Sequence, residues 1–249
     1  SGADHGMVRT WIISLVDAGI NPASINRKIA CLRTFFKFLL REQVIKANPM
    51  TKIRVLKTPK RLPAFVKESD MAQVLDQREF EDSFAGWRER LILELFYGTG
   101  IRLSELIGLT EQSVDLKERT IKVLGKRKKE RVIPFSAHLV KILEGYLSMK
   151  RRSVSVVSDA LLVTESGGPC YSTMIYRIVK NNLYTYTTAE KTSPHVLRHT
   201  YATHLLNKGA EINAVKDLLG HSSLAATQVY THNSMEKIKK AFDQAHPKA

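Results

Sequence analysis

Apolar residues recur every three or four positions along residues 25–40, the spacing that gives an α-helix one hydrophobic face. The residues on this face are Ile25, Ile29, Leu32, Phe36, Leu39 and Leu40. Asn21 and Pro22 come just before the pattern, and an asparagine N-cap followed by proline in the first turn signals a helix start. The sequence therefore predicts an amphipathic helix from Pro22 in a helical N-terminal unit.

Helical spacing returns further along the chain. Residues 68–75 and 87–97 fit it, and the sequence Gly-Thr-Gly at 98–100 then interrupts the pattern. Ser193 and Pro194 open another predicted helix, which ends near Gly209. A last one covers residues 212–219 and stops at a glycine, the residue most often found just after a helix.

Residues 120–135 have a different period. Ile121 and Val123 alternate with polar residues, a charged turn covers residues 125–131, and Val132 and Ile133 resume the apolar pattern. Alternation on both sides of a short turn is typical of a β-hairpin, here with a basic tip. The fold class predicted from these elements is mainly α with a small antiparallel β-sheet.

Residues 57–63 contain two prolines and three cations, so they can neither continue a helix nor fill a core strand. We interpret them as a linker between a helical unit at residues 1–56 and a larger unit at residues 64–249. Residues 1–63 hold 12 Lys and Arg against 3 Asp and Glu. Much of the formal net charge of +15 therefore lies in the first quarter of the chain.

A strongly basic chain, with a pI of about 9.8, favours polyanionic partners, with nucleic acid first and an anionic membrane surface second. No apolar run approaches the roughly 20 residues that span a bilayer, so no membrane partner is predicted. Cys31 and Cys170 are far apart and outside any Cys-x-x-Cys pair. Free thiols in a reducing compartment, and hence the cytoplasm, are expected.

Several kinds of chemistry lack their sequence signals. No Gly-x-x-x-x-Gly-Lys-Ser/Thr loop is present to hold ATP, and no His-Glu-x-x-His is present to hold zinc. His195, His199 and His204 are close in sequence, with His221 as a conceivable further ligand, but cations lie among them and no acidic residues surround them. We therefore expect no metal and no cofactor.

Four basic or histidine-containing segments stand out in a fixed order. They are GIRLSEL at 100–106, GKRKKER at 125–131, SPHVLRHTYATHLL at 193–206, and LLGHS at 218–222 followed by TQVYTH at 227–232. Together they resemble the tyrosine recombinase family, also called phage integrases, and its Xer-like bacterial branch in particular. The resemblance covers roughly residues 20–249 and implies a two-domain architecture, a helical core-binding domain followed by a catalytic domain.

The resemblance also implies which residues are catalytic. The two catalytic arginines fall on Arg102 and Arg198, the hairpin lysine on Lys126, and the two histidine positions on His195 and His221. The nucleophile falls on Tyr230. Guanidiniums suit the task because they bind phosphate oxygens bidentately and stay charged. Glu105, one turn after Arg102, either orients that arginine or is exposed.

In the family the roles differ by residue. A base, here His195, helps to deprotonate a tyrosine whose usual pKa is about 10. The hairpin lysine, here Lys126, protonates the leaving 5′ oxygen, and His221 donates a hydrogen bond to the phosphate. The implied activity is cleavage and rejoining of DNA through a 3′-phosphotyrosine intermediate, without metal or ATP, giving strand exchange through a Holliday junction.

The resemblance implies double-stranded DNA as partner and an oligomer on it, a dimer and a synaptic tetramer of this chain or a hetero-oligomer with a paralogue. The basic residues expected to contact DNA are Arg27, Lys28, Arg33, Lys37, Arg127, Lys128, Lys129 and Arg131. Residues 1–56 are expected to be a partial, truncated core-binding domain. The tail at 235–249 is expected to dock on a neighbouring protomer or on its own domain.

Two other functions compete with a site-specific recombinase. A type IB topoisomerase or resolvase-like enzyme would use the same chemistry without partner exchange. A structural DNA-binding protein would need only the basic helices. The helical N-terminal unit favours recombination over the topoisomerase, and the complete catalytic set argues against a purely structural role.

Overall fold

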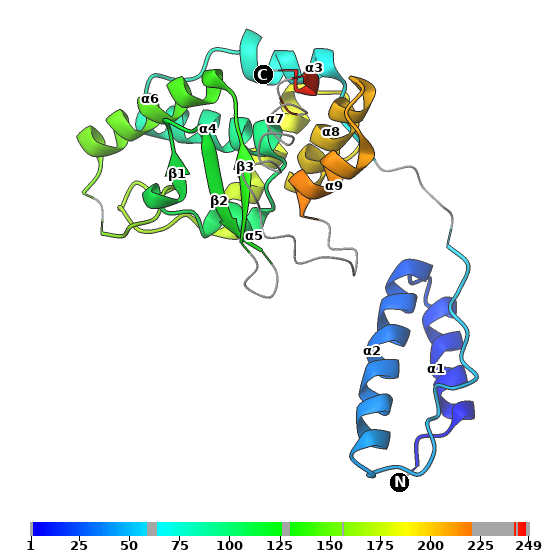
Figure 1. Ribbon diagram of the computed structural model, residues 1–249. Helices are drawn as coiled ribbons and strands as arrows, with labels where there is room; N and C mark the ends of the chain where they lie inside the picture. The colour runs from blue at the N-terminus through cyan, green and yellow to red at the C-terminus, as the bar shows by residue number, and fades with distance from the viewer. Residues whose placement is uncertain are drawn as a thin grey trace. The chain divides into compact units, whose positions relative to one another are not determined.

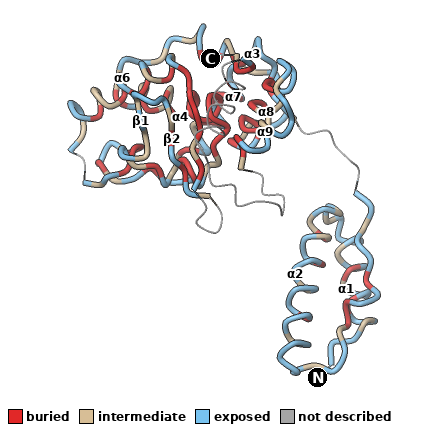
Figure 2. The backbone as a smooth tube through the Cα atoms, in the orientation of Figure 1, coloured by how far each residue is buried: buried red, intermediate tan, exposed pale blue. Residues whose placement is uncertain are grey.

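The computed structural model describes residues 2–58, 64–125, 130–155, 157–220, 242 and 244–247. The chain divides into two compact units, residues 1–62 and residues 63–249 (Figure 1). Each unit has its own hydrophobic core, visible as separate groups of buried residues in Figure 2. Within the described ranges, no helix is both long enough and apolar enough to cross a membrane.

The first unit is built on helices α1 (His5–Asp17) and α2 (Pro22–Arg41). The predicted start of α2 is confirmed, because the Asn21 side chain accepts a hydrogen bond of 2.9 Å from the backbone N–H of Ala23. The predicted apolar face is only partly buried, since Leu40 at its end is 40% exposed. The core of this unit consists of Val8, Ile12, Ile25, Ile29, Phe36, Met50 and Ile53.

The second unit is organised around α4 (Phe84–Thr99), in which 12 of 16 residues are buried. A helix buried on almost every side belongs in the middle of a core rather than on its surface. It follows α3 (Glu68–Ala72), which continues into the π-helix η1 (Gln73–Gln77). The helices predicted at 68–75 and 87–97 are therefore present, although the first changes its winding and the second begins earlier.

A three-stranded antiparallel sheet, β1 (Val114–Asp115), β2 (Thr120–Leu124) and β3 (Glu130–Pro134), shares the hydrophobic core with α4 and confirms the predicted hairpin. The register pairs Ile121 with Ile133 and Val123 with Arg131. Before the sheet come the short helices α5 (Leu103–Ile107) and η2 (Glu111–Ser113). The chain is thus mainly helical with one small sheet, as predicted.

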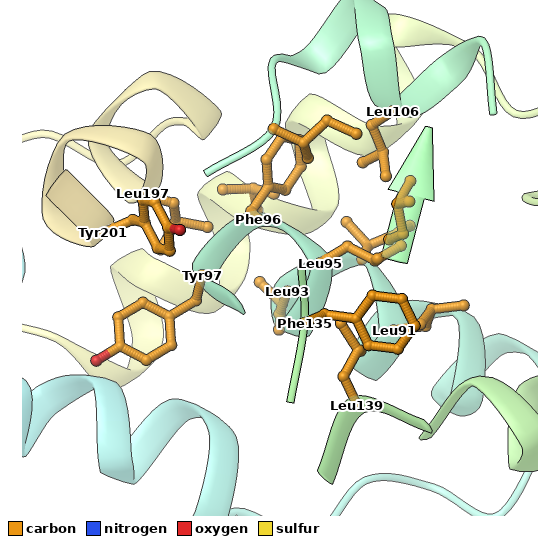
Figure 3. Close-up of a cluster of buried hydrophobic side chains, with 14 of the residues drawn as sticks. Leu91, Leu93, Leu95, Phe96, Tyr97, Leu106, Phe135, Leu139, Leu197 and Tyr201 are labelled. Atoms are coloured by element: carbon orange, nitrogen blue, oxygen red, sulfur yellow. The ribbon is translucent and has the colours of Figure 1, made fainter. Parts of the chain in front are cut away.

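The remaining helices are α6 (Ala137–Ser153), α7 (Ser172–Tyr186), α8 (Pro194–Asn207) and α9 (Ile212–Leu219). α4 packs against α6 and α8. Figure 3 shows Leu95 and Phe96 of α4 between Leu106 of α5 and the pair Leu197 and Tyr201 of α8. Ser193 caps α8 by accepting a hydrogen bond from the N–H of Val196, as its sequence predicted.

The described part of the tail packs on its own unit. The side chain of Phe242 is 1% exposed, and its ring stacks on that of His246 with centroids 4.7 Å apart. A nitrogen of His246 lies 3.2 Å from the backbone oxygen of Tyr97 in α4. The described residues of the tail therefore contribute to the hydrophobic core of their own unit.

Candidate active site

Arg102 is held in place where α4 ends and α5 begins. The chain turns at Gly100, whose φ of +60° is the left-handed conformation that glycine adopts at helix ends. A Cβ at Gly100 would lie 2.5 Å from a ring carbon of Tyr201, so the turn presses directly against α8. Arg102 then caps α5, and its backbone N–H donates to Glu105 Oε2 at 2.8 Å.

Arg198 reaches the same turn from α8. Its Nη1 donates to the carbonyl of Gly100 at 2.6 Å, and its Nη2 donates to the carbonyl of Leu219 at 2.5 Å. The residue is only 7% exposed. Burial and then repulsion from Arg102 lower the pKa of Arg198 to about 10, so the guanidinium is still charged at neutral pH. One buried cation therefore joins α4, α8 and α9.

Three arginines meet at the C-terminal end of α9. Besides Arg198, Arg102 donates through Nη2 to the carbonyl of Gly220 at 3.2 Å, and Arg131 donates through Nε to the carbonyl of Leu218 at 3.2 Å. The last carbonyls of a helix have no partner within it and carry partial negative charge. Consecutive carbonyls thus hold the three side chains, which we call the arginine cluster.

A single carboxylate, Glu105, lies within the arginine cluster. Its Oε1 is 2.7 Å from Arg102 Nη1 and 2.6 Å from Arg131 Nη1, and its Oε2 accepts from Arg131 Nη2 at 2.9 Å. Burial alone would raise the pKa of Glu105, but the hydrogen bonds from Arg131 and Arg102 outweigh it and lower the pKa to about 2. Glu105 therefore orients Arg102. Of the two alternatives that the sequence left open, an orienting residue or an exposed one, this is the first.

The low pKa of Glu105 should make the larger unit lose stability in acid. A carboxylate whose folded pKa of about 2 lies below its ordinary 4.5 stabilises the fold above about pH 4.5, and this contribution disappears as the pH falls toward 2. Each pKa unit corresponds to about 1.4 kcal/mol, so we expect a loss of about 3 kcal/mol. Denaturant unfolding, followed by Trp87 fluorescence in a Trp11→Phe background, should measure it.

The control is the variant Glu105→Gln, which has no charge to lose. Its free energy of unfolding should be lower than that of the parent at neutral pH and should change less on acidification. Other carboxylates titrate in both proteins, so the difference between the two curves isolates Glu105. Parallel curves for parent and variant would contradict the ionised, paired Glu105.

Three histidines on α8 have different surroundings. His195, in the first turn and three residues before Arg198, is exposed. His199 is half-buried, and burial and the nearby His195 lower its pKa. His204 is buried, and its Nδ1 lies 3.0 Å from the hydroxyl of Tyr97. His204 is therefore a packing residue, while His195 and Arg198, spaced i and i+3, lie on one side of the helix.

Several predicted residues lie outside the described part of the chain. These are Lys126, Arg127, Lys128, Lys129, His221 and Tyr230. In the first unit, Arg27, Lys28, Arg33 and Lys37 are all exposed on α2, and Arg33 also donates to the carbonyl of Ile53. The exposed charges leave this helix able to contact phosphates.

Arg131 needs a correction. The sequence suggested a DNA contact at the hairpin tip, but this residue is 5% exposed and its guanidinium faces Glu105 and Leu218. Strand alternation explains the difference, because Arg131 pairs with Val123, and Ile133, two residues along, pairs with Ile121, all on the buried face of the hairpin. The period of the strand therefore carried a signal that the residue points inward.

A possible metal-binding group occurs elsewhere in the unit. Asp76, Glu94 and His138 offer ligand atoms within 4.8 Å of one another, the one such group found in the described ranges. His138 Nε2 lies 3.1 Å from Glu94 Oε1. The group shares no residue with the arginine cluster, and we assign it no part in the site.

Comparison with known proteins identifies the chain's family. Residues 64–237 match the model of the phage integrase family, and residues 2–43 match the model of the phage integrase N-terminal SAM-like domain. The chain belongs to the phage integrase family of tyrosine recombinases. The resemblance drawn from the sequence is thereby confirmed, and the match to the first model includes Arg102, Arg131 and Arg198.

This tyrosine recombinase has similar relatives over most of its length. The tyrosine recombinase XerC of Chlorobaculum parvum is 35% identical over 97% of this chain and 78% of the relative. The XerC of Bacillus subtilis is 36% identical over 97% of this chain and 80% of the relative. The same fold occurs in the XerH site-specific recombinase bound to palindromic difH substrate, with a TM-score of 0.75 at 23% identity over 96% of this chain and 72% of that one.

Proposed function

We propose that this tyrosine recombinase cleaves and rejoins double-stranded DNA at a specific site through a 3′-phosphotyrosine intermediate, with Arg102 and Arg198 of the arginine cluster as its phosphate-binding residues. The observation that carries the proposal is the surplus of positive charge at the end of α9. Three guanidiniums face one carboxylate, and their mutual repulsion contributes to the lowered pKa of Arg198. A phosphodiester would add negative charge to a cluster in which, among the described residues, three cations share one carboxylate.

The two proposed phosphate ligands, Arg102 and Arg198, keep donors for a ligand. A guanidinium has five N–H groups. Arg102 uses one Nη1 bond for Glu105 and one Nη2 bond for Gly220, and its side chain is 28% exposed. Arg198 uses one bond from each Nη atom for backbone carbonyls. In-line attack adds negative charge to the phosphate oxygens, and fixed donors aimed at them stabilise that transition state.

The other roles are those that the resemblance to the family implies. Tyr230 loses its proton with help from His195 and attacks phosphorus, and the bond from phosphorus to the 5′ oxygen breaks. Lys126 gives that oxygen a proton, while His221 donates a hydrogen bond to a phosphate oxygen. The products are a 3′-phosphotyrosine and a free 5′ hydroxyl. Attack by the 5′ hydroxyl of another strand then restores a phosphodiester and releases the tyrosine.

The partners fit the same chemistry. DNA is bound by the larger unit at the arginine cluster and by the exposed cations of α2, Arg27, Lys28, Arg33 and Lys37. The XerH structure, a recombinase bound to its difH substrate, supports DNA as the partner. Exchange between two duplexes through a Holliday junction requires several protomers, identical or paralogous. Such a reaction on the chromosome or a mobile element takes place in the cytoplasm.

Trapping the covalent intermediate tests the function directly. The target site is recovered by sequencing DNA that stays covalently attached to the chain in native cells. A duplex of that site, nicked close to the cleavage point, loses the short released strand, so rejoining fails and the intermediate accumulates. A label at the 5′ end of the cut strand should stay with the protein, and a label at its 3′ end should not.

The attachment point is read by mass spectrometry. Trypsin cuts after Lys216 and Lys237, and the peptide between them contains a single tyrosine, Tyr230. We expect the nucleotide mass on this peptide. Retention of the 3′ label instead of the 5′ label, or attachment to any other peptide, would overturn the proposed chemistry.

A further inference from the structure

Arg131 belongs to none of the proposed catalytic groups, yet it is among the most connected side chains of the site. It leaves β3, is 5% exposed, and binds both oxygens of Glu105 at 2.6 and 2.9 Å. Its Nε donates at 3.2 Å to the carbonyl of Leu218 in the last turn of α9. One guanidinium therefore joins the hairpin, the carboxylate that orients Arg102, and the end of α9.

Gly220 shows how closely the backbone fits against this arginine. A Cβ at Gly220 would lie 2.9 Å from Arg131 Cδ and 3.2 Å from its Nε. The glycine has a φ of +62°, the left-handed conformation that ends α9. Its carbonyl accepts from Arg102. The stretch of backbone that leads into His221 is thus packed on Arg131 and bonded to Arg102.

An arginine is suited to this position in a way that lysine is not. Its planar fork can bind two carboxylate oxygens and still direct Nε at a third acceptor, whereas an ammonium group is a point charge on a flexible stem. Glu105 meanwhile uses Oε1 for Arg102 as well as for Arg131. Loss of the fork would free this shared carboxylate to move, and Arg102 would move with it.

We propose that Arg131 is a positioning residue that fixes, through Glu105 and the carbonyl of Leu218, the relative placement of Arg102 and of the backbone entering His221. The inference rests on the proposed function, because it matters only if Arg102 and Arg198 bind the scissile phosphate. Arg131 also pairs with Val123, one residue pair before the segment between β2 and β3 whose sequence contains Lys126. It aligns groups from three segments of the chain without touching DNA.

Arg131→Gln and Arg131→Lys test this role in single-turnover cleavage of saturating nicked duplex of the target site. A misplacement of reacting groups by about 1 Å costs about 100-fold in rate, so we expect the glutamine variant to cleave about 100-fold more slowly. The lysine variant should be intermediate. Affinity for the duplex should stay near that of the parent, because the side chain of Arg131 is 6% exposed.

The matched control on the same hairpin is Lys122→Gln. It also removes one cation, but from an exposed pair with Glu130 whose side chains are 58% and 55% exposed. Such pairs contribute little to stability. Its cleavage rate should stay close to that of the parent, which separates the loss of a nearby charge from the loss of alignment.

A second pair of variants reaches Arg131 from the backbone. Gly220→Ala places a methyl group against Arg131. Gly209→Ala has the same kind of left-handed backbone, with a φ of +87°, and no atom of the described residues lies within 4 Å of its new Cβ. Both substitutions place alanine in a left-handed conformation and therefore strain the backbone. We expect Gly220→Ala alone to slow cleavage of bound duplex markedly, and this test remains available if Arg131→Gln fails to fold.

The pH dependence distinguishes positioning from a purely structural role. In the parent, Arg102 and Arg131 keep Glu105 ionised, with Arg198 as the third cation facing it. Without Arg131 the pKa of Glu105 rises. The cleavage rate of Arg131→Gln should therefore fall more steeply than that of the parent between about pH 7 and about pH 5.

The possible results distinguish a failure of the proposed function from a failure of the positioning role of Arg131. A parent chain that forms no adduct would overturn the proposed function. A parent that forms the Tyr230 adduct, together with Arg131→Gln cleaving at the parental rate or Gly220→Ala cleaving as fast as Gly209→Ala, would overturn only the positioning role. Slow cleavage with intact binding, a steeper pH profile and a normal Lys122→Gln support it.

Discussion

Replacing Tyr230 with phenylalanine should abolish the covalent protein–DNA adduct while DNA affinity stays close to that of the parent. Phenylalanine keeps the ring and lacks the oxygen, so no bond to phosphorus can form. The nicked duplex, run on a denaturing gel, reports the adduct, and fluorescence anisotropy reports binding. No residual rate is expected, because the other members of the site stabilise the transition state without supplying a nucleophile.

Tyr201 offers the matched control for this substitution. It lies in α8 three residues after Arg198, is 1% exposed, and its hydroxyl has no hydrogen-bond partner among the described residues. Burial raises its pKa, so its phenol stays protonated. Tyr201→Phe removes an oxygen that has no hydrogen-bond partner in the described part of the chain, and it should leave adduct formation intact. An adduct that persists in Tyr230→Phe, or disappears in Tyr201→Phe, would contradict the assignment of the nucleophile.

Local signals in the sequence were enough for the elements with clear ends. Asn21 and Ser193 cap their helices as predicted, and α9 covers the predicted residues 212–219. The alternation at 120–135 predicted the hairpin. Strand β1, two residues long, and the π-helix η1, at the end of the helix predicted at 68–75, left no comparable signal. Both elements have tertiary neighbours, since η1 packs against α7 and α4 and β1 pairs with β2.

The candidate site, too, could be predicted from the sequence only in part. Sequence motifs pointed to Arg102, His195 and Arg198, but their spacing in the chain does not bring Arg102 and Arg198 to consecutive carbonyls of one helix end. That contact depends on the turn at Gly100 packing on Tyr201. It is a tertiary fit between residues about 100 positions apart, which a periodic pattern does not encode.

Arg131 shows most clearly where prediction from the sequence failed. Its charge in a run of basic residues suggested a solvated hairpin tip, while its place in the strand pattern put it on the buried face beside Ile133. The strand pattern predicted the burial of Arg131 correctly. The buried side chain is tolerated because Glu105, which is also buried, compensates its charge. The sequence does not show which carboxylate will lie beside Arg131, so Arg131 was interpreted as a solvated cation without a partner.

Replacing Arg198 with alanine should slow adduct formation by about a thousandfold. Two unit charges about 4 Å apart at an effective dielectric constant of about 20 interact by about 4 kcal/mol. Each 1.4 kcal/mol or so of lost transition-state stabilisation costs about tenfold in rate. The interaction should be strong here because Arg198 is 7% exposed and therefore poorly screened by water. Single-turnover cleavage of saturating nicked duplex measures the rate.

The variant should also lose stability, because Arg198 bonds to the carbonyls of Gly100 and Leu219. A buried acceptor left unsatisfied costs about 1–3 kcal/mol. Arg88→Ala is the matched control for this effect. Arg88 is 4% exposed and donates to the carbonyl of Val163 at 3.1 Å and to Glu165 at 2.6 Å, neither of them in the arginine cluster.

The two alanine variants should therefore differ in catalysis and resemble each other in stability. Both should unfold at lower denaturant concentration than the parent, and only Arg198→Ala should lose its cleavage rate. Arg198→Lys should remain slow, since one ammonium cannot hold both carbonyls and also present a fork to the phosphate. If Arg88→Ala and Arg198→Ala slowed cleavage equally, general destabilisation would explain the result. The phosphate-binding role of Arg198 would then be refuted.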